Sequence, residues 1–271
     1  MPELPEVETT RRGIAPYVTG KRVSKVIVRQ PSLRWPVTPT LARELPGHTI
    51  DKLERRGKYL LLKTRIGTLL THLGMSGSFR VLHTMEIPGK HDHVDIIFES
   101  GLVLRYSDPR RFGCLLWEPN SIESHPLLKS LGPEPLSDEL DGEYLYRKSR
   151  KKVASVKVFI MDAKVVVGIG NIYANEALFM AGINPTRAAG KISQLRYRVL
   201  ADCIKKILNK SIKKGGTTLR DFTNVSGNPG YFKQSLQVYG RSGMACRKCK
   251  KILKEIRLGQ RSTIYCTACQ K

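Results

Sequence analysis

The N-terminal half of the chain changes from a helical to a strand-like pattern of apolar positions. Residues 6–19 alternate charged and apolar side chains with a period near 3.6, which predicts a helix. From there to about residue 118, short apolar runs alternate with turn-forming residues, as in an antiparallel sandwich or barrel. The clearest runs are residues 23–28, 59–62, 68–73, 79–82, 94–98 and 102–106.

Beyond a Gly-Pro-Glu-Pro linker at 132–135, the pattern predicts helices. Ser193 is placed to cap a helix over 193–212, and Gly215-Gly216 stops it. Residues 217–239 show little periodicity, and so long a stretch inside a compact domain is usually functional or disordered. The apolar stripe of the 193–212 helix consists of Leu195, Val199, Leu200, Cys203, Ile204, Ile207 and Leu208.

Between these segments, an apolar helix end is expected to run into Gly168-Ile169-Gly170. Asn171 is then expected to cap a new helix that ends near Gly182. Glycines allow close approach of a phosphate, and a helix N-terminus binds anions. On spacing alone, a plain corner between two helices explains the pattern equally well.

The charge of the chain narrows the class of partner. Lys and Arg number 47 against 23 Asp and Glu, a formal charge of +24 over 271 residues. Such a field attracts polyanions, so it indicates nucleic acid without specifying which. A membrane-surface role is disfavoured, because no apolar run reaches about 18 residues and the start lacks a signal peptide's basic and apolar regions. We therefore expect a cytoplasmic protein.

Six cysteines divide into two groups. Cys114 and Cys203 stand alone in apolar stretches and are expected to be small core residues. The other four form two Cys-x2-Cys pairs separated by sixteen residues, which suits tetrahedral zinc: Cys246, Cys249, Cys266 and Cys269. Disulfides are the alternative, but a basic cytoplasmic chain disfavours them. Four thiolates leave no open position for catalysis, so the expected zinc ion is structural.

The start of the chain offers a second kind of chemistry. Once Met1 is removed, Pro2 presents a secondary amine with a pKa of about 8, against about 10.4 for a lysine. Such an amine attacks carbon at the carbonyl oxidation level and forms an iminium. Glu3 lies beside it as a proton donor. Taken alone, the dipeptide is more often an ordinary chain start.

Several segments, in order from one end of the chain to the other, match the pattern of one known family. They are residues 2–9, 55–60, 72–77, 90–93, 108–113, 168–173 and 237–241, together with the four-cysteine tail and its Gln260-Arg261. Through these segments the chain resembles the formamidopyrimidine-DNA glycosylase family of bacterial base-excision repair.

This resemblance implies a bifunctional DNA glycosylase and AP lyase that removes 8-oxoguanine and formamidopyrimidines. Pro2 would attack C1′ of the lesion nucleotide as the base leaves, and Glu3 would act as acid and base toward the deoxyribose. Lys58 and Arg261 match the other catalytic positions and would anchor the flanking phosphates during β,δ-elimination. By residue type alone, both cations would be ordinary solvated side chains.

The resemblance also implies that the damaged nucleotide is extruded from the duplex. Met75, Arg110 and Phe112 would fill the void and pair with the orphaned base, although Met75 and Phe112 could instead be core residues of the sheet. The residues expected to contact DNA more widely are His91, Arg110, Lys152, Lys157 and Asn171. A metal site at His91-Asp92-His93 is disfavoured because no third ligand has useful spacing.

Two residues depart from the family pattern: Val158 and Ala163 stand where proline and a polar residue are common. The resemblance therefore does not determine the backbone geometry of the segment before the glycine turn at 168–170. One alternative function is an endonuclease VIII-like enzyme for oxidised pyrimidines, against which Leu4 and the joint presence of Met75, Arg110 and Phe112 argue. Another is a non-catalytic zinc-ribbon DNA-binding protein, which composition alone does not exclude.

Together these expectations describe an α+β multidomain protein. An N-terminal antiparallel β-sandwich flanked by helices is expected over 1–131 and a helix-two-turn-helix domain over 132–216. A lesion-recognition loop over 217–240 and a four-cysteine zinc-finger hairpin over 241–271 follow. The expected cofactor is one structural zinc ion, with no organic cofactor. The expected partner is damaged double-stranded DNA, bound by a monomer without a membrane, in the bacterial cytoplasm at the nucleoid.

Overall fold

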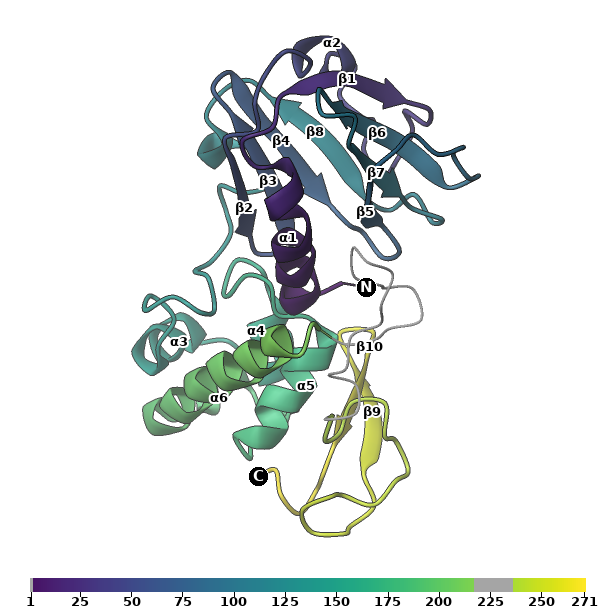
Figure 1. The fold of residues 1–271 in the computed structure, drawn as a ribbon. Helices are drawn as coiled ribbons and strands as arrows, with labels where there is room; N and C mark the ends of the chain where they lie inside the picture. Colours follow the sequence, from purple (N-terminus) through teal and green to yellow (C-terminus); the bar gives the residue numbers. More distant parts are fainter. Residues whose placement is uncertain (1, 217–235) are drawn as a thin grey trace. The chain divides into compact units, whose positions relative to one another are not determined.

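A computed structural model describes residues 2–216 and 236–271 of the chain, and these form two compact units (Figure 1). The first contains residues 2–129 and 214–216, and the second contains 130–213 and 236–271. The expected α+β fold with an N-terminal sandwich is confirmed. The finer division into four segments stays a prediction. Most of the expected recognition loop, 217–235, lies outside the described residues.

The first unit is a sandwich of two four-stranded sheets in which every strand pairs antiparallel. One sheet has the order β1-β6-β7-β5 and the other β2-β3-β4-β8. Their bounds are Val23–Val28, Lys52–Arg56, Tyr59–Thr64, Gly67–His72, Ser78–Leu82, Asp92–Phe98, Val103–Ser107 and Cys114–Glu118 for β1 to β8. The runs named from the sequence cover neither β2 nor β8, and in β2 the segment Lys-Leu-Glu-Arg-Arg shows neither an apolar run nor clean alternation.

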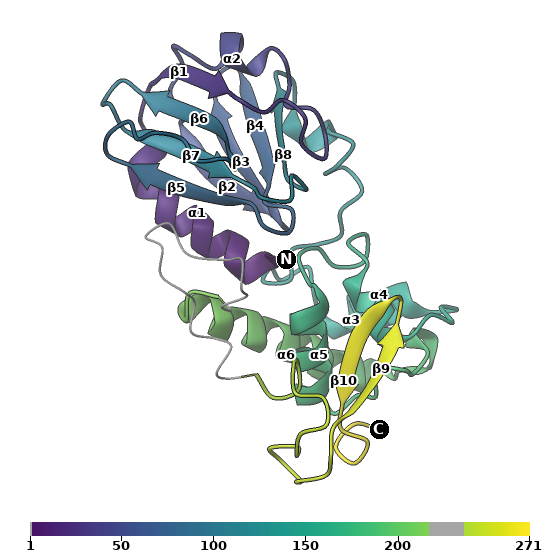
Figure 2. The ribbon, with the colours of Figure 1, turned by 90° about the vertical axis from the view of Figure 1, so that its right-hand side faces the viewer.

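Helix α1 (Leu4–Val18) contacts β2, β3 and β5, and both views show it beside the sandwich (Figures 1 and 2). Its buried apolar side chains Val7, Ile14 and Val18 join the core formed between the two sheets. Burial of this stripe explains the 3.6-residue period at the start of the chain. Two short helices, α2 (Leu41–Glu44) and the 3₁₀ helix η1 (Ile122–Ser124), complete this unit.

The second unit contains four α-helices and one 3₁₀ helix among its described residues. They are α3 (Gly142–Ser149), α4 (Val156–Met161), α5 (Asn171–Met180), η2 (Ala189–Lys191) and α6 (Gln194–Lys213). Ser193 does cap α6, since its hydroxyl accepts the Arg196 N–H at 3.4 Å. The predicted stripe of α6 is wrong at its start. Leu195 and Val199 are 70% and 44% exposed, because the buried face runs instead through Tyr197, Leu200 and Ala201.

The turn before α5 also differs from the expectation. Helix α4 ends at Met161, so residues 162–170 form turns and bends rather than a helix that runs into the glycines. Gly170, in an extended conformation, is the N-cap, and Asn171 is the first residue inside the helix. Gly168 has φ +86°, a conformation that favours glycine. Asn171 therefore lies in the first turn of α5, one residue later than predicted.

The chain ends in a two-stranded hairpin, β9 (Lys254–Leu258) and β10 (Arg261–Tyr265), whose second strand packs against α5. Gly259 and Gln260, both with positive φ, form the turn between the strands. A small core that includes Val238, Leu253 and Ile264 lies at the base of this hairpin. In the part of the chain that the structure describes, no helix is long and apolar enough to cross a membrane.

Candidate catalytic and nucleic-acid site

Pro2 and Glu3 immediately precede helix α1, and both are buried. Glu3 is the N-cap of the helix in an extended conformation. Its backbone N–H donates to the Glu6 carboxylate at 2.9 Å, and the two residues form a capping box. Because a capping box satisfies donors at the helix start, it determines how the chain enters α1. The position of the Pro2 backbone follows from it.

Glu8 connects this helix to the sheet beside it. Its carboxylate accepts hydrogen bonds from Arg11 and Arg12 on the helix and from Arg55 of β2, at 2.7–3.1 Å. Burial opposes ionisation of Glu8, yet these arginines outweigh it and lower its pKa to about 2. Arg55 also donates to the Gly57 carbonyl at 3.0 Å. The helix that starts at Pro2 is therefore connected to the β2–β3 turn.

The β2–β3 turn carries Lys58, whose side chain is half-buried. His72, at the end of β4, contacts the Tyr59 ring in a tilted arrangement with ring centroids 4.9 Å apart. Burial, together with the positive charges of Lys58 and Arg34, lowers the pKa of His72 to about 4. The Gly74 N–H donates to its Nδ1 at 2.9 Å, so the neutral ring carries its proton on Nε2. His72 is thus a neutral donor near Lys58.

Two loops of the sandwich, residues 73–77 and 108–113, are joined by one buried carboxylate. Asp108 is fully buried, and its four acceptor contacts come from both loops and from β7. Gly74, with φ +63°, allows the loops to touch, since a Cβ there would lie 2.4 Å from the Phe112 carbonyl carbon. The donors to Asp108 are Ser76 Oγ at 2.7 Å, Arg110 N at 3.2 Å, Tyr106 OH at 3.1 Å and Gly113 N at 2.8 Å.

These loops present the three residues predicted to fill a void in DNA. The Arg110 guanidinium lies 4.9 Å from the centre of the Phe112 ring. Arg110 is exposed, Phe112 is 42% exposed and Met75 is half-buried. Neither Met75 nor Phe112 belongs to the sandwich core, so the alternative that both are core residues is wrong. Their role on DNA stays a prediction.

The sequence pattern indicates no role for Asp108 or His72, although both lie within segments that match the family. Asp108 begins the Asp-Pro-Arg-Arg-Phe-Gly segment, and an aspartate before proline is a common turn acceptor. That signal marks a turn, but it does not reveal that the carboxylate also reaches Ser76, 32 residues away. His72 gave even less signal, because its environment arises only when β3 and β4 pair.

The other predicted DNA contacts differ in exposure. His91 and Lys152 are exposed, and Asn171 is half-buried in the first turn of α5. Lys157 is fully buried, and its ammonium donates to the Ser262 carbonyl at 2.8 Å and to Thr263 Oγ1 at 2.7 Å. The structure therefore places the Lys157 ammonium against strand β10. Its predicted contact with the DNA backbone stays a prediction.

Arg261 is exposed and begins strand β10, directly after the tight turn at Gly259 and Gln260. Val158 lies against this turn, since a Cβ on Gly259 would come within 3.1 Å of Val158 Cγ2. The departure at Val158 thus lies beside the turn that precedes Arg261. Ala163 is exposed, and its carbonyl accepts the Gly132 N–H at 2.8 Å.

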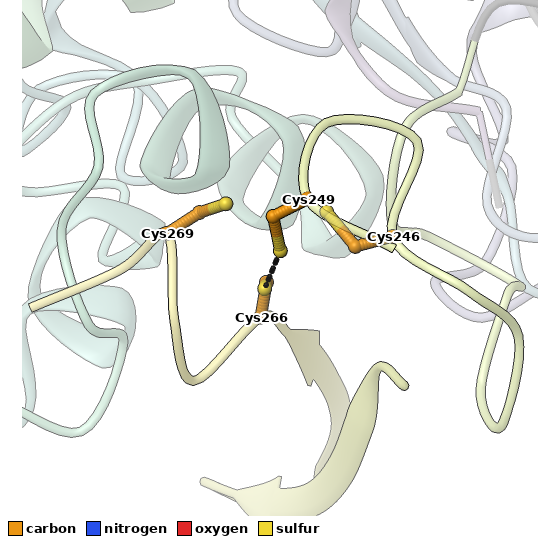
Figure 3. Close-up of side chains that lie close together, drawn as sticks. All are labelled: Cys246, Cys249, Cys266 and Cys269. Carbon is orange, nitrogen blue, oxygen red and sulfur yellow. Dashed lines mark hydrogen bonds between the residues drawn. The ribbon is translucent and has the colours of Figure 1, made fainter. Parts of the chain in front are cut away.

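Four cysteine side chains converge at the base of the hairpin (Figure 3). The sulfurs of Cys246, Cys249, Cys266 and Cys269 all lie within 4.8 Å of one another, and the Cys249 and Cys266 sulfurs are 3.4 Å apart. A tetrahedral zinc–thiolate site, with Zn–S of about 2.3 Å, needs sulfurs about 3.8 Å apart. The cluster therefore fits one zinc ion with four protein ligands.

Two cysteines of the cluster have pKa values shifted in opposite directions. Burial opposes ionisation of Cys266, but backbone N–H groups of Cys269 and Ala268 lower its pKa to about 7, whereas burial and the neighbouring sulfurs raise the pKa of Cys269. The two remaining cysteines behave as expected, since Cys114 and Cys203 are both buried. Burial raises the pKa of Cys114 to about 12, which keeps it an unreactive thiol.

Three family models match the chain along its length. They describe the formamidopyrimidine-DNA glycosylase N-terminal domain (residues 1–115), the formamidopyrimidine-DNA glycosylase H2TH domain (131–223) and a zinc finger found in FPG and IleRS (244–271). The chain belongs to the formamidopyrimidine-DNA glycosylase family.

Individual relatives agree over whole chains. The formamidopyrimidine-DNA glycosylases of Saccharophagus degradans and Stenotrophomonas maltophilia are 58% and 57% identical over 271 residues, covering all of each chain. The structure of the MutM (Fpg) protein from Thermus thermophilus matches with a TM-score of 0.89 at 35% identity, covering 99% of this chain and 98% of that one. The Lactococcus lactis Fpg in complex with DNA containing an abasic site matches with a TM-score of 0.91 at 33% identity, covering both chains fully.

These findings confirm several expectations from the sequence. The enzyme class, a glycosylase with AP lyase activity for oxidised purines in DNA, is confirmed. The single structural zinc ion is confirmed by the zinc-finger match and the four-cysteine cluster. The non-catalytic zinc-ribbon alternative is wrong, since the N-terminal family model covers the sandwich that carries Pro2. The roles of individual site residues stay predictions.

Proposed function

We propose that this enzyme excises oxidised purines by attack of the Pro2 nitrogen on C1′ of the lesion nucleotide. The N–C1′ bond forms as the C1′–base bond breaks, and the base leaves with a proton. Glu3 protonates the ring oxygen, the sugar opens, and the amine lone pair completes an iminium at C1′. Pro2 has this secondary amine only in a chain from which Met1 has been removed.

Strand cleavage follows from the iminium. It acidifies the C2′ proton, whose loss expels the 3′-phosphate by β-elimination. Further deprotonation expels the 5′-phosphate by δ-elimination and leaves a one-nucleotide gap. Lys58 and Arg261 anchor the phosphates on either side and stabilise the charge that develops on them.

The lesion reaches Pro2 by leaving the base stack. Met75 and Phe112 occupy the space it vacates, and Arg110 pairs with the base on the opposite strand. Asp108 holds both loops that present these residues, which agrees with this role. Side chains that fill the vacated space must stay in place while the neighbouring base pairs tend to restack. His91, Lys152 and Asn171 bind the backbone, and Lys157, whose ammonium is buried against β10, supports the strand that begins with Arg261. The protein acts as a monomer on damaged duplex DNA, in the bacterial cytoplasm at the nucleoid.

One observation supports this proposal most directly: the start of the chain is built into the structure. The capping box orders Glu3, and the Glu8–Arg55 contact connects α1 to the turn that carries Lys58. An ordinary chain start would not need a buried proline and glutamate. A nucleophile does need this order, because its reach must match the position of C1′.

A comparison of two damaged duplexes tests the proposed substrate. The enzyme should cleave an 8-oxoguanine:C duplex at least tenfold faster than a thymine-glycol duplex of the same flanking sequence, measured as single-turnover rates. The product should be a gap with phosphate at both ends. A preference for thymine glycol would favour the endonuclease VIII-like function and overturn this one.

A further inference from the structure

Asn175 on helix α5 makes contacts that none of the roles above uses. Its side chain is 2% exposed. Its Nδ2 donates to the Asn171 carbonyl at 2.6 Å and lies 3.4 Å from Asn171 Oδ1. Its Oδ1 accepts the backbone N–H of Ile264, on β10, at 2.9 Å. One amide thus spans from the first turn of α5 to the zinc-finger hairpin.

The partners determine the orientation of this amide. A backbone N–H can only donate and a backbone carbonyl can only accept. Asn175 must therefore turn its oxygen to Ile264 and its nitrogen to Asn171. No water or ion is needed to satisfy either contact, and a shorter or purely apolar side chain would leave the Ile264 N–H without this acceptor.

The two ends of this bridge are close in sequence to predicted DNA contacts. Asn171 is itself one of them, and Ile264 lies three residues beyond Arg261 on the same short strand. Strand β10 is also tied at Ser262 and Thr263 by the buried Lys157 ammonium. The strand that begins with Arg261 is therefore attached to α4 and α5 at three consecutive residues.

We propose that Asn175 is a positioning residue that makes Asn171 and Arg261 act as one unit in DNA binding. It touches neither substrate nor reacting atoms. It acts by holding the first turn of α5 and strand β10 in a fixed relative position. This inference rests on the proposed function, because it assumes that Asn171 and Arg261 bind DNA phosphates.

A double-mutant cycle tests this coupling without requiring catalysis. The readout is the Kd of the zinc-loaded protein for a duplex containing a tetrahydrofuran abasic-site analogue. Asn175→Ala should weaken binding about tenfold, the equivalent of about 1.4 kcal/mol, in the range of a lost buried hydrogen bond. In an Arg261→Ala or Asn171→Ala background, it should weaken binding less than about threefold, because the positioned contact is already gone.

Two controls separate positioning from general weakening. In a Lys152→Ala background, Asn175→Ala should keep its full tenfold effect. Lys152 is an exposed residue predicted to contact DNA, and it lies on neither of the elements that Asn175 joins. Gln270→Ala removes an equally buried amide that joins the hairpin to the helical part, through the Cys266 N–H and the Ile183 carbonyl. It should change Kd less than about threefold.

Zinc content and thermal midpoint are measured for every variant, and Asn175→Ser goes through the same cycles in case alanine prevents folding. Full additivity with both Arg261→Ala and Asn171→Ala would overturn the proposal. So would an equal loss of affinity in a Gln270→Ala protein that retains its zinc. Cleavage of the 8-oxoguanine:C duplex by the unmodified enzyme is assayed in parallel. Its absence would refute the proposed function, whereas additive cycles in an active enzyme would refute this inference alone.

Discussion

At the scale of single residues, charges determine how α1 meets the sheet. The Glu8 side chain is only 10% exposed and contacts three arginines. Since its pKa is lowered from 4.5 to about 2 in the folded protein, the folded state favours the ionised form. The stabilisation is present above the unfolded pKa and is lost as pH falls from about 4.5 toward 2.

Replacing Glu8 with glutamine should therefore remove an acid-sensitive part of the stability. At pH 7, Glu8→Gln should lower the free energy of unfolding by up to about 3 kcal/mol, and at pH 2 the variant and the unmodified protein should be similar. Urea unfolding at both pH values measures this difference. Glu143→Gln, whose side chain is 67% exposed, is the control and should change little. An equal deficit of Glu8→Gln at both pH values would contradict the argument.

Among the features of the site, the reactive and metal-binding residues were the easiest to predict from the sequence. The N-terminal proline and the paired cysteines have recognisable chemistry and spacing before any folding is considered. The contributions of His72 and Asp108 were not predictable, since burial and long-range contacts create them. The buried ammonium of Lys157 shows the same limit. A lysine in a basic sequence gives no sign that β10 will cover it.

At the scale of elements, the two loops that present Met75, Arg110 and Phe112 depend on one carboxylate. Asp108 accepts four hydrogen bonds, two of them from residues of the 108–113 loop and one from the 73–77 loop. These are polar contacts in a buried setting, which are costly to break.

Asp108→Asn should loosen both loops. The amide nitrogen of asparagine is itself a donor, so it would replace an oxygen that now accepts hydrogen bonds from the loops. We expect a loss of about 2–4 kcal/mol in unfolding free energy and at least a tenfold lower single-turnover rate on 8-oxoguanine:C duplex. Urea unfolding and a cleavage assay provide the two readings. Asp51→Asn, an exposed acid of the same unit, should alter neither. An unchanged rate in Asp108→Asn would remove the loops from the account of catalysis.

The zinc-finger hairpin depends on its metal in a different way. Its core contains few apolar residues, two of them zinc-binding cysteines, so little else can hold it folded. Cys249→Ser should release the zinc ion, measured by a chromogenic chelator, and weaken DNA binding at least tenfold. Cys203→Ser, a buried cysteine on α6 outside the cluster, should retain zinc. Retained zinc in Cys249→Ser would contradict the assignment.

Element prediction succeeded where periodicity was strong and failed where packing decides. Helices α1 and α6 were found within about two residues of their ends. The stripe of α6 was misplaced because Leu195 and Val199 are apolar yet face outward. Strand β2 was missed because its charged sequence becomes a strand only through pairing with β3.

At the scale of the whole molecule, residues predicted to act on DNA occur in each of the two units. Pro2, Glu3 and Lys58 belong to the first, and Asn171 and Arg261 belong to the second. Each unit has its own stabilising devices: the capping box, Glu8 and Asp108 in one, and Asn175 with the zinc cluster in the other. The central claim nevertheless concerns a single atom, the nitrogen of Pro2.

Borohydride trapping with an 8-oxoguanine:C duplex tests that claim most directly. The protein lacking Met1 should form a covalent adduct that peptide mass spectrometry locates at Pro2. Protein that retains Met1 should form none, and Pro2→Gly should form far less. An adduct located at a lysine, or one whose yield is unchanged in Pro2→Gly, would contradict the account.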